Sequence, residues 1–269
     1  DVDSLKGWVE GQNENLPIMA TDLEGLKANK GSTYIQFQYR DTTARGSGFT
    51  SGRDNQGNFA FRRIRIGSTQ KVDSKTSIKY SFDAATGTEQ NAFQLRDAIL
   101  IYDIVPSDVT VGTQLAAGQQ GLILGYELGR SSSEREFPER ATYNRMFFDG
   151  ERNRGLVLTH GLGEHMLVQA GLGSSLTYND GEQRGLATAP QNKLAGSFAV
   201  RYFNDSVDAG ISHFQGERPS LTTTNTGAAA VTHPELTRRF WYADVNVTNF
   251  LVPNLLFRAE GMIGHDRRP

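Results

Sequence analysis

The stretch Gly31-Ser32-Thr33-Tyr34-Ile35-Gln36-Phe37-Gln38-Tyr39-Arg40 places Thr, Ile, Phe and Tyr at alternate positions, with Tyr, Gln and Arg between them. Successive side chains of a β-strand point to opposite faces of its sheet, so this period of two predicts a strand with two unlike faces. The pattern returns along the chain in about eleven segments of roughly 7–12 residues, which is typical of a transmembrane barrel strand. We therefore predict an all-β, antiparallel, up-and-down fold.

The remaining segments are named here by their residues. They lie at 60–66, 77–83, 93–103, 109–115, 155–161, 165–178, 193–202, 207–212, 241–248 and 255–263. In segment 60–66 we assign Ile64 and Ile66 to the apolar face, together with Ala60, and Phe61 to the opposite face with Arg63 and Arg65. Tight turns at 161–164 and 203–206 contrast with long polar stretches at 116–154, 179–192 and 215–237. Short turns at one rim and long loops at the other are expected of an outer-membrane barrel.

The sequence holds no apolar run that approaches the roughly 20 residues of a membrane-spanning helix. If the chain crosses a membrane, it must do so as a closed barrel, because only helices and closed barrels satisfy all backbone polar groups in lipid. The 29 glycines and only 8 prolines favour a sheet protein. A soluble β-sandwich also alternates, and it stays open as an alternative. Against it, the apolar face is often made of small residues, and basic residues lie at mid-strand.

Charge and composition exclude several classes of function. The formal net charge of −2 gives no basic field for nucleic acid, and the absence of cysteine removes thiol chemistry and disulfides. His160 and His165 flank Glu164 in the run His-Gly-Leu-Gly-Glu-His, at a predicted turn and not on a helix, so a zincin geometry is absent. We predict that the chain is not an enzyme and that it needs no cofactor or metal.

The N-terminal 30 residues differ from the rest. They are Leu-rich in a polar background, and glycines together with Pro17 argue against one long helix. We interpret residues 1–30 as a periplasmic lead-in or the stub of a tether, and residues 31–269 as the barrel. Because the chain closes on Arg267-Arg268-Pro269 and not on a strand with a terminal aromatic residue, we expect the barrel to be incomplete at this end.

Four passages carry a family resemblance. They are Asn-Phe-Ala-Phe-Arg-Arg-Ile-Arg-Ile-Gly-Ser at 58–68, the paired runs 95–102 and 109–114, the run Phe-Pro-Glu-Arg-Ala at 137–141, and Arg-Asn-Arg-Gly-Leu at 152–156. In this order and spacing the chain resembles the phosphate-selective (O/P-type) porins, over about residues 58–180. The resemblance implies a barrel of about 16 strands, of which about 11–12 are visible here, in a Gram-negative-type outer membrane. It also implies a homo-trimer and a loop folded into the lumen.

The polar face supplies candidate pore-lining residues. If the apolar parity faces lipid, the opposite parity lines a watery lumen. The basic residues of that parity are Arg40, Arg63, Arg65, Lys79, Arg201 and Arg258. The acidic ones are Asp83, Asp208, Asp244 and Glu260. Six basic against four acidic residues give a mild bias toward anions, and guanidinium forks suit phosphate or carboxylate. The alternative is that these arginines simply pair with acids on neighbouring strands.

The long segment 116–154 is the candidate constriction loop. Its named candidates are Arg130, Arg135, Glu136, Glu139, Arg140 and Arg145. Basic and acidic residues balance within the segment, so a salt-bridged plug, a neutral filter and a pair of oppositely charged walls all stay open.

The expected function is passive diffusion of small hydrophilic solutes and ions through an outer-membrane pore, with anions or phosphate preferred. Outer-membrane lipid, small anions or polar solutes, and two further copies of the chain are the expected partners, and nucleic acid is not. Two alternatives stay open: a structural barrel that anchors the envelope to the cell wall, and a soluble β-sandwich that binds glycans.

Overall fold

The structure is a computed structural model. It describes residues 29–42, 56–85, 93–106, 112–135, 137, 139–148, 151–175, 194–219, 235–249 and 251–267. The chain divides into two compact units, Asp1–Leu95 and Arg96–Pro269. The helix found in these ranges is too short to span a membrane. The predicted lead-in falls, up to residue 28, outside the described residues.

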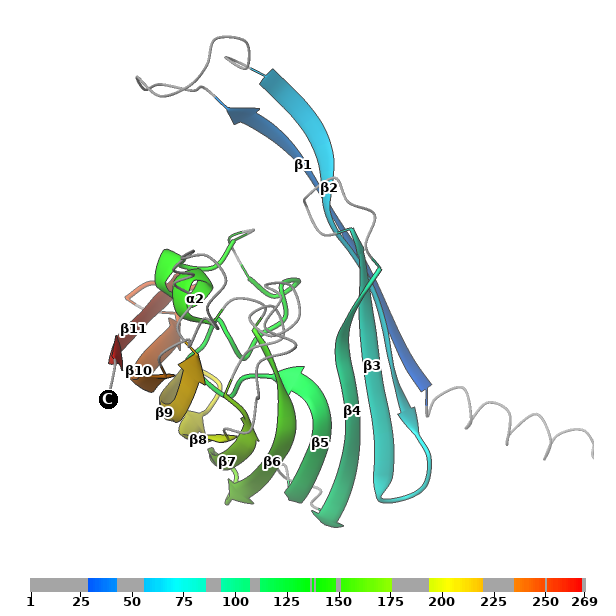
Figure 1. Ribbon diagram of the computed structural model, residues 1–269, viewed down its shortest axis with the longest axis vertical. Helices are drawn as coiled ribbons and strands as arrows, with labels where there is room; N and C mark the ends of the chain where they lie inside the picture. The colour runs from blue at the N-terminus through cyan, green and yellow to red at the C-terminus, as the bar shows by residue number, and fades with distance from the viewer. Residues whose placement is uncertain are drawn as a thin grey trace, which may run out of the picture. The chain divides into compact units, whose positions relative to one another are not determined.

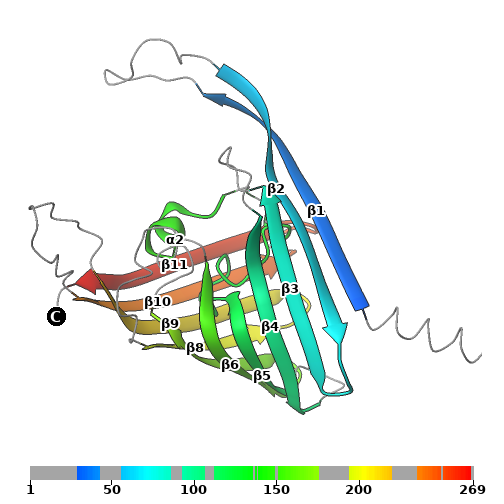
Figure 2. The same ribbon diagram turned by 45° about the vertical axis from the view of Figure 1, so that its right-hand side comes forward.

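The first unit is an antiparallel sheet of three strands. They are β1 (Asn29–Thr42), β2 (Gln56–Lys71) and β3 (Thr76–Ala85). β1 pairs with β2 along its full length, whereas β3 pairs with β2 only from Ile64 onward. Residues 56–63 of β2 therefore form a two-stranded ribbon with the end of β1 (Figure 2).

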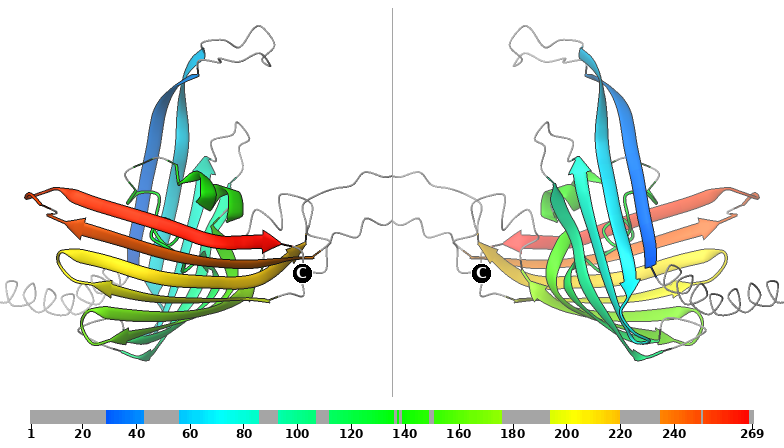
Figure 3. Two further views of the ribbon diagram at one scale, coloured as in Figure 1. Left: turned by 90° about the vertical axis from the view of Figure 1, so that its left-hand side faces the viewer. Right: turned by 90° about the vertical axis from the view of Figure 1, so that its right-hand side faces the viewer.

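The second unit holds eight strands, β4 to β11, each antiparallel to the next along the chain. They are β4 (Gln94–Val105), β5 (Thr113–Gly121), β6 (Arg152–Leu162), β7 (Met166–Ser174), β8 (Leu194–Phe203), β9 (Val207–Pro219), β10 (Glu235–Thr248) and β11 (Leu256–Arg267). A short helix, α2 (Thr142–Phe147), lies between β5 and β6 in the chain. Figure 3 shows β8 to β11 side by side, in yellow to red.

The connections alternate in length, as the sequence predicts. The stretches after β2, β4, β6, β8 and β10 are short, and those after β1, β3, β5, β7 and β9 are longer. The turn after β8 is closed by Asn204, whose Oδ1 accepts hydrogen bonds from the backbone N–H groups of Ser206 and Val207. Gly163 adopts φ 64° in the predicted turn after β6, a left-handed conformation that suits glycine.

The two faces of the strands differ as their alternation predicts. In β10, Trp241 is 48% exposed, whereas the next residue, Tyr242, is 1% exposed. In β9, Ile211 is 58% exposed beside the buried Ser212. A soluble domain buries large apolar side chains of this kind, so a whole exposed apolar face indicates a surface that meets lipid or a partner.

One face assignment is wrong, because β2 carries a bulge. Gln36 pairs with Arg63 and Phe37 pairs with Phe61, which leaves Arg62 as an extra residue. The bulge reverses the parity of β2 at this point. Phe61 therefore lies on the apolar face, 5.2 Å from the ring of Phe37 and on the face opposite to Arg63.

The strand predicted at 109–115 is also displaced. β5 runs from Thr113 to Gly121, and residues 107–111 lie outside the described ranges. The strand continues through Ala116, Ala117 and Gly118, which have weak strand propensity, because both neighbours, β4 and β6, pair with it there. The long segment between β5 and β6 is consequently 122–151.

Candidate functional site

Segment 122–151 lies against the polar face of β8 to β11. Its side chains form an apolar cluster with residues of those strands, and Phe148 stands edge-on to Phe214 and Phe240 at 5.3 and 5.4 Å between ring centroids. The cluster comprises Leu122, Leu124, Leu128, Phe148, Ala195, Phe214, Phe240 and Tyr242. Burial of these rings and aliphatic side chains fixes the segment on the sheet, and Figure 1 shows α2 near β10 and β11.

Glu260 of β11 accepts four hydrogen bonds from the segment. Its Oε2 accepts hydrogen bonds from the backbone N–H groups of Tyr126 and Glu127, at 2.8 and 2.9 Å. Its Oε1 accepts from the Tyr143 hydroxyl at 3.0 Å and from Asn144 Nδ2 at 3.2 Å. One carboxylate therefore binds two separate parts of the segment.

Tyr143 of α2 stays protonated in this contact. Burial raises the pKa of its hydroxyl, and the negative charge of Glu260 raises that pKa further. Both causes favour the neutral phenol. The hydroxyl can therefore donate to Glu260 over the whole physiological pH range.

Arg201 of β8 joins three elements. Its Nη1 binds Asp208 Oδ1 of β9 at 2.5 Å, and its Nη2 binds both carboxylate oxygens of Asp244 of β10 at 2.9 and 3.0 Å. Nη2 also donates to the carbonyl of Gly125 in the segment at 3.4 Å. Asp208 in turn accepts from Arg130 Nη2 of the segment at 2.6 Å. Two arginines and two aspartates thus alternate from the wall to the segment.

Tyr126 lies between two guanidinium groups. Arg258 of β11 is 3.9 Å from the centroid of the Tyr126 ring and donates a hydrogen bond to its hydroxyl at 2.7 Å. Arg130 is 4.4 Å from the same centroid. Cations over an aromatic face are stabilised by the negative charge of its π-system. Arg258 also binds Asn246 of β10.

A second cluster joins the C-terminal end of the segment to its interior and to β4. Glu151, at the start of β6, forms ion pairs with Arg140, with Arg96 at 3.1 Å and with Arg152 at 3.5 Å. Arg152 also binds Asp97 of β4 at 2.7 Å. Arg140 Nε donates to the carbonyl of Glu127 at 2.8 Å.

The C-terminal end of α2 is bound by Arg238 of β10. Its fully buried guanidinium donates to the carbonyl of Phe147 and lies 4.9 Å from the centroid of the Phe148 ring. Asp266 Oδ2 of β11 is 3.6 Å from Arg238 Nε. An unsatisfied helix carbonyl and a buried cation thereby stabilise each other.

The predicted pore-lining residues of the first unit lie on its polar face where their side chains are described. Arg63 is buried and donates to Gln36 Oε1 at 2.7 Å. Arg65 forms a two-pronged ion pair with Asp83 at 2.8 and 2.6 Å. Lys79 is exposed. Arg40 belongs to β1, but its side chain lies outside the described residues.

The predicted loop residues are brought together only in part. Arg130 and Arg140 make the contacts given above, and Arg145 is exposed in the last turn of α2. Arg135 and Glu139 are half-buried in the segment, and Glu136 lies outside the described residues. Arg130 and Arg140 bind different carboxylates, Asp208 and Glu151, so these two arginines do not act together on one site.

Sequence reasoning missed several residues of the site. Tyr126, Tyr143, Asn144 and Arg238 were not singled out, although the first three bind Glu260 and Arg238 binds the end of α2. Glu260 itself is separated from Tyr126 by 134 positions. No local pattern signals such a contact, and only the isolated glycine at position 125 hints at a close approach.

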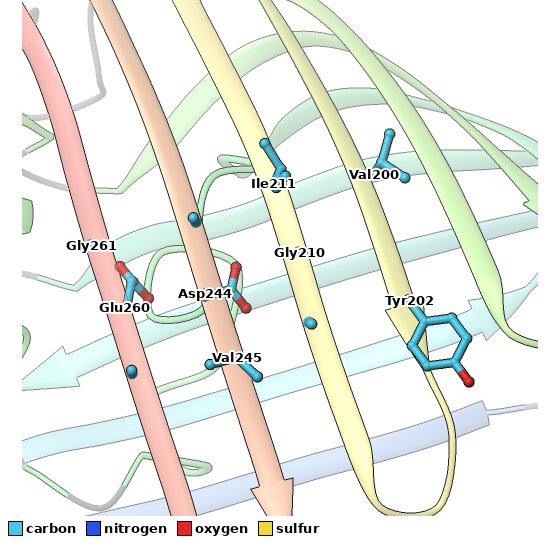
Figure 4. Close-up of a pocket in the computed structure, with 11 residues that line it drawn as sticks. Val200, Tyr202, Gly210, Ile211, Asp244, Val245, Glu260 and Gly261 are labelled. Carbon is cyan, nitrogen blue, oxygen red and sulfur yellow. The ribbon is translucent and has the colours of Figure 1, made fainter.

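An open hollow of about 640 Å³ lies over β8 to β11, lined mostly by small or apolar residues. Figure 4 shows Asp244 and Glu260 of its lining on adjacent strands. Both carboxylates already accept the hydrogen bonds described above. Most of the lining belongs to the exposed apolar face of these strands, which includes Tyr202 and Ile211, whereas the two carboxylates make their contacts on the polar face.

Comparison with known protein families matches residues 32–232 to the family described as "Phosphate-selective porin O and P". This match covers well over half of the chain, including segment 122–151, β8 and β9, and it ends before β10 and β11. The chain belongs to this porin family. The predicted family resemblance is thereby confirmed.

Membership of the family confirms the all-β, up-and-down barrel fold and the outer-membrane location of this porin. The apolar face of its strands accordingly meets lipid, and the soluble β-sandwich is not supported. The family indicates a channel and not an enzyme.

Other comparisons add a remote likeness. The porin is similar to an outer membrane protein of Vibrio cholerae, OmpT folded in vitro, in its trimer form. The identity is 11%, the match covers 89% of each chain, and the TM-score is 0.33. No curated protein matches the sequence.

Proposed function

We propose that the porin lets small hydrophilic solutes and ions diffuse through a pore that segment 122–151 narrows. The observation that carries this proposal is the position of the segment on the polar face of β8 to β11, where an apolar cluster and the Glu260 carboxylate hold it. A segment that occupies the polar face of a barrel wall reduces the cross-section open to solutes.

The proposed lining of the pore comprises Arg40, Arg63, Arg65, Lys79, Arg201 and Arg258. The proposed constriction comprises Arg130, Arg135, Glu136, Glu139, Arg140 and Arg145. We expect the preference for anions to be weak, because Arg201 and Arg130 are both held in ion pairs. Their carboxylate partners Asp208 and Asp244 neutralise much of the guanidinium charge that a passing anion would meet.

We further propose small anions, phosphate among them, as preferred solutes, and a homo-trimer as the assembly. The family description supports the anion preference. The exposed apolar faces of the strands are available to lipid and to neighbouring copies.

Conductance of the purified porin in planar lipid bilayers tests this proposal. Steps of current in potassium chloride are expected, and a tenfold salt gradient should give a small reversal potential of the sign for anion preference. Absence of steps from correctly folded protein would end the proposal of a pore. A reversal potential of the opposite sign would remove only the anion preference.

A further inference from the structure

We propose that Glu260 is the positioning residue that fixes segment 122–151 to the barrel wall, so that the constriction is static and does not open and close. The inference rests on the proposed function, in which this segment narrows the pore. The Glu260 carboxylate sets how far the segment projects into the pore.

The geometry points to Glu260 because its two oxygens bind different parts of the segment. Oε2 accepts from the successive backbone N–H groups of Tyr126 and Glu127, and Oε1 accepts from Tyr143 and Asn144 of α2. Charge-assisted hydrogen bonds of this kind are about twice as strong as neutral ones. A single side chain therefore ties the turn after Gly125 to the helix that follows it.

Glu127 repeats this arrangement within the segment. Its Oε2 accepts from the backbone N–H of Ala141 at 2.8 Å and from Asn144 Nδ2 at 3.0 Å. Asn144, which is fully buried, thus donates to both carboxylates and accepts from the Tyr242 hydroxyl at 3.1 Å. The turn and α2 are therefore bound to each other, and Glu260 is the wall residue that binds both of them.

The closeness of segment and wall is a second, independent observation. Gly125 adopts φ 56°, and a Cβ added there would lie 2.9 Å from Glu260 Oε1 and 2.8 Å from Tyr242 Cδ1. Both the left-handed backbone and the lack of space require glycine at this position. The backbone of the segment therefore touches the wall at Glu260.

Glu260 lies beside an unfavourable neighbour. Glu260 and Asp244 are direct cross-strand partners in β10 and β11, and like charges in such a pair are destabilising. Asp244 is bound by Arg201, whereas the four hydrogen-bond donors that the described chain gives to Glu260 are all uncharged. The best explanation for a carboxylate at this position is that it binds segment 122–151.

Spin-label spectroscopy on the folded porin in detergent micelles tests the anchor directly. The chain has no cysteine, so Met146→Cys, at an exposed position of α2, introduces a single labelling site. In this parent the ordered backbone of α2 should limit the motion of the label, so that the spectrum contains an immobilised component. Glu260→Ala should cause loss of the immobilised component, while Glu164→Ala, which removes an exposed carboxylate from the turn after β6, should leave the spectrum unchanged.

Glu260→Gln gives a graded second variant. Its amide oxygen can still accept from the two backbone N–H groups, but its NH₂ group faces the donor of Asn144. The immobilised component should therefore fall to a value between those of the parent and Glu260→Ala. If Glu260→Ala yields no folded porin, Glu260→Gln decides the question, and a spectrum identical to that of the parent overturns the proposal.

Single-channel records of the same variants separate the anchor from the pore. With the segment released, the current through Glu260→Ala channels should fluctuate between levels, where the parent holds one level. A released label with unchanged current supports the anchor and contradicts the constriction. A label that stays immobilised in folded Glu260→Ala overturns the anchor, whatever the current does.

Discussion

Two arginine–aspartate contacts on the polar face of this porin differ in what the arginine holds. In β2, Arg65 binds Asp83, its direct cross-strand neighbour in β3, through two parallel hydrogen bonds. In β8, Arg201 binds Asp208 of β9, reaches across to Asp244 of β10, and donates to the carbonyl of Gly125. One contact joins neighbouring strands, and the other joins three strands to the inserted segment.

The difference shows that mid-strand arginine has two uses in one wall. A guanidinium that matches one carboxylate stabilises the sheet locally. A guanidinium shared among several acceptors couples the wall to whatever rests on it, and its removal should therefore disturb more than one element.

The largest effect is expected for Arg201→Ala. It leaves the carboxylates of Asp208 and Asp244 close together without their shared cation, so we expect a loss of about 3 kcal/mol in stability. The reversal potential should also shift toward cations. Urea unfolding in micelles and conductance in a salt gradient measure the two effects. Arg239→Ala, at an exposed position of β10, is the matched control, and an equal effect of both variants would contradict the role of Arg201.

Arg65→Ala should have a smaller effect. The variant strands the buried Asp83 carboxylate, which costs about 2 kcal/mol, and the shift of reversal potential toward cations should be smaller than for Arg201→Ala because one carboxylate, and not two, loses its cation. The double variant Arg65→Ala/Asp83→Ala should regain part of the loss, since no lone charge is buried. A double variant less stable than the single one would show that the pair contributes more than the charge balance implies.

Arg130→Ala should cost less again. The Arg130 side chain is 39% exposed, and Asp208 keeps Arg201 as its partner, so a loss of about 1 kcal/mol or less is expected. The shift of reversal potential toward cations should be smaller than for Arg201→Ala and should fade at high salt. A shift larger than that of Arg201→Ala would mean that the exposed arginine, and not the shared one, governs selectivity.

The smallest effect concerns the turn that joins β2 and β3. Backbone hydrogen bonding from Lys75, followed by contacts with Thr76, lowers the pKa of Asp73 below its ordinary value of 3.8. The pKa of Asp73 is lower in the folded state than in the unfolded state. Asp73 therefore stabilises the fold when the pH is above the ordinary pKa, and this stabilisation is lost as the pH falls through the pKa of the folded state. Acid titration of the Lys75 and Thr76 amide NMR signals measures this. Asp73→Asn, which cannot titrate there, should abolish the transition.

Strand pattern and turn chemistry were predictable from the sequence because they are local. Alternation in β10 correctly assigned Trp241 and Tyr242 to opposite faces, and Asn204 lies in a predicted tight turn. The acids Asp208, Asp244 and Glu260 were also assigned to the polar face, where the structure places them.

The partners of Glu260 could not be predicted, because they are set by the path of a segment more than a hundred residues away. Glu260 could equally have bound Arg201 or solvent, and nothing near it in the chain names Tyr126 or Tyr143. The bulge at Arg62 was missed for a different reason. Two adjacent arginines satisfy either parity, so the strand pattern looks continuous across it.

At that bulge, the odd-numbered side chains of β2 change from one face of the sheet to the other. Phe59 and Phe61 precede Arg62 and contact the ring of Phe37, while the odd-numbered Arg63 and Arg65 follow it on the other face. Deleting Arg62 would restore strict alternation and, in doing so, turn either the aromatic half of β2 toward water or its arginines toward lipid. The deletion of one residue, which most loops would tolerate, should therefore not be tolerated here. The extra arginine keeps the aromatic half of β2 on the apolar face and its arginines on the polar face.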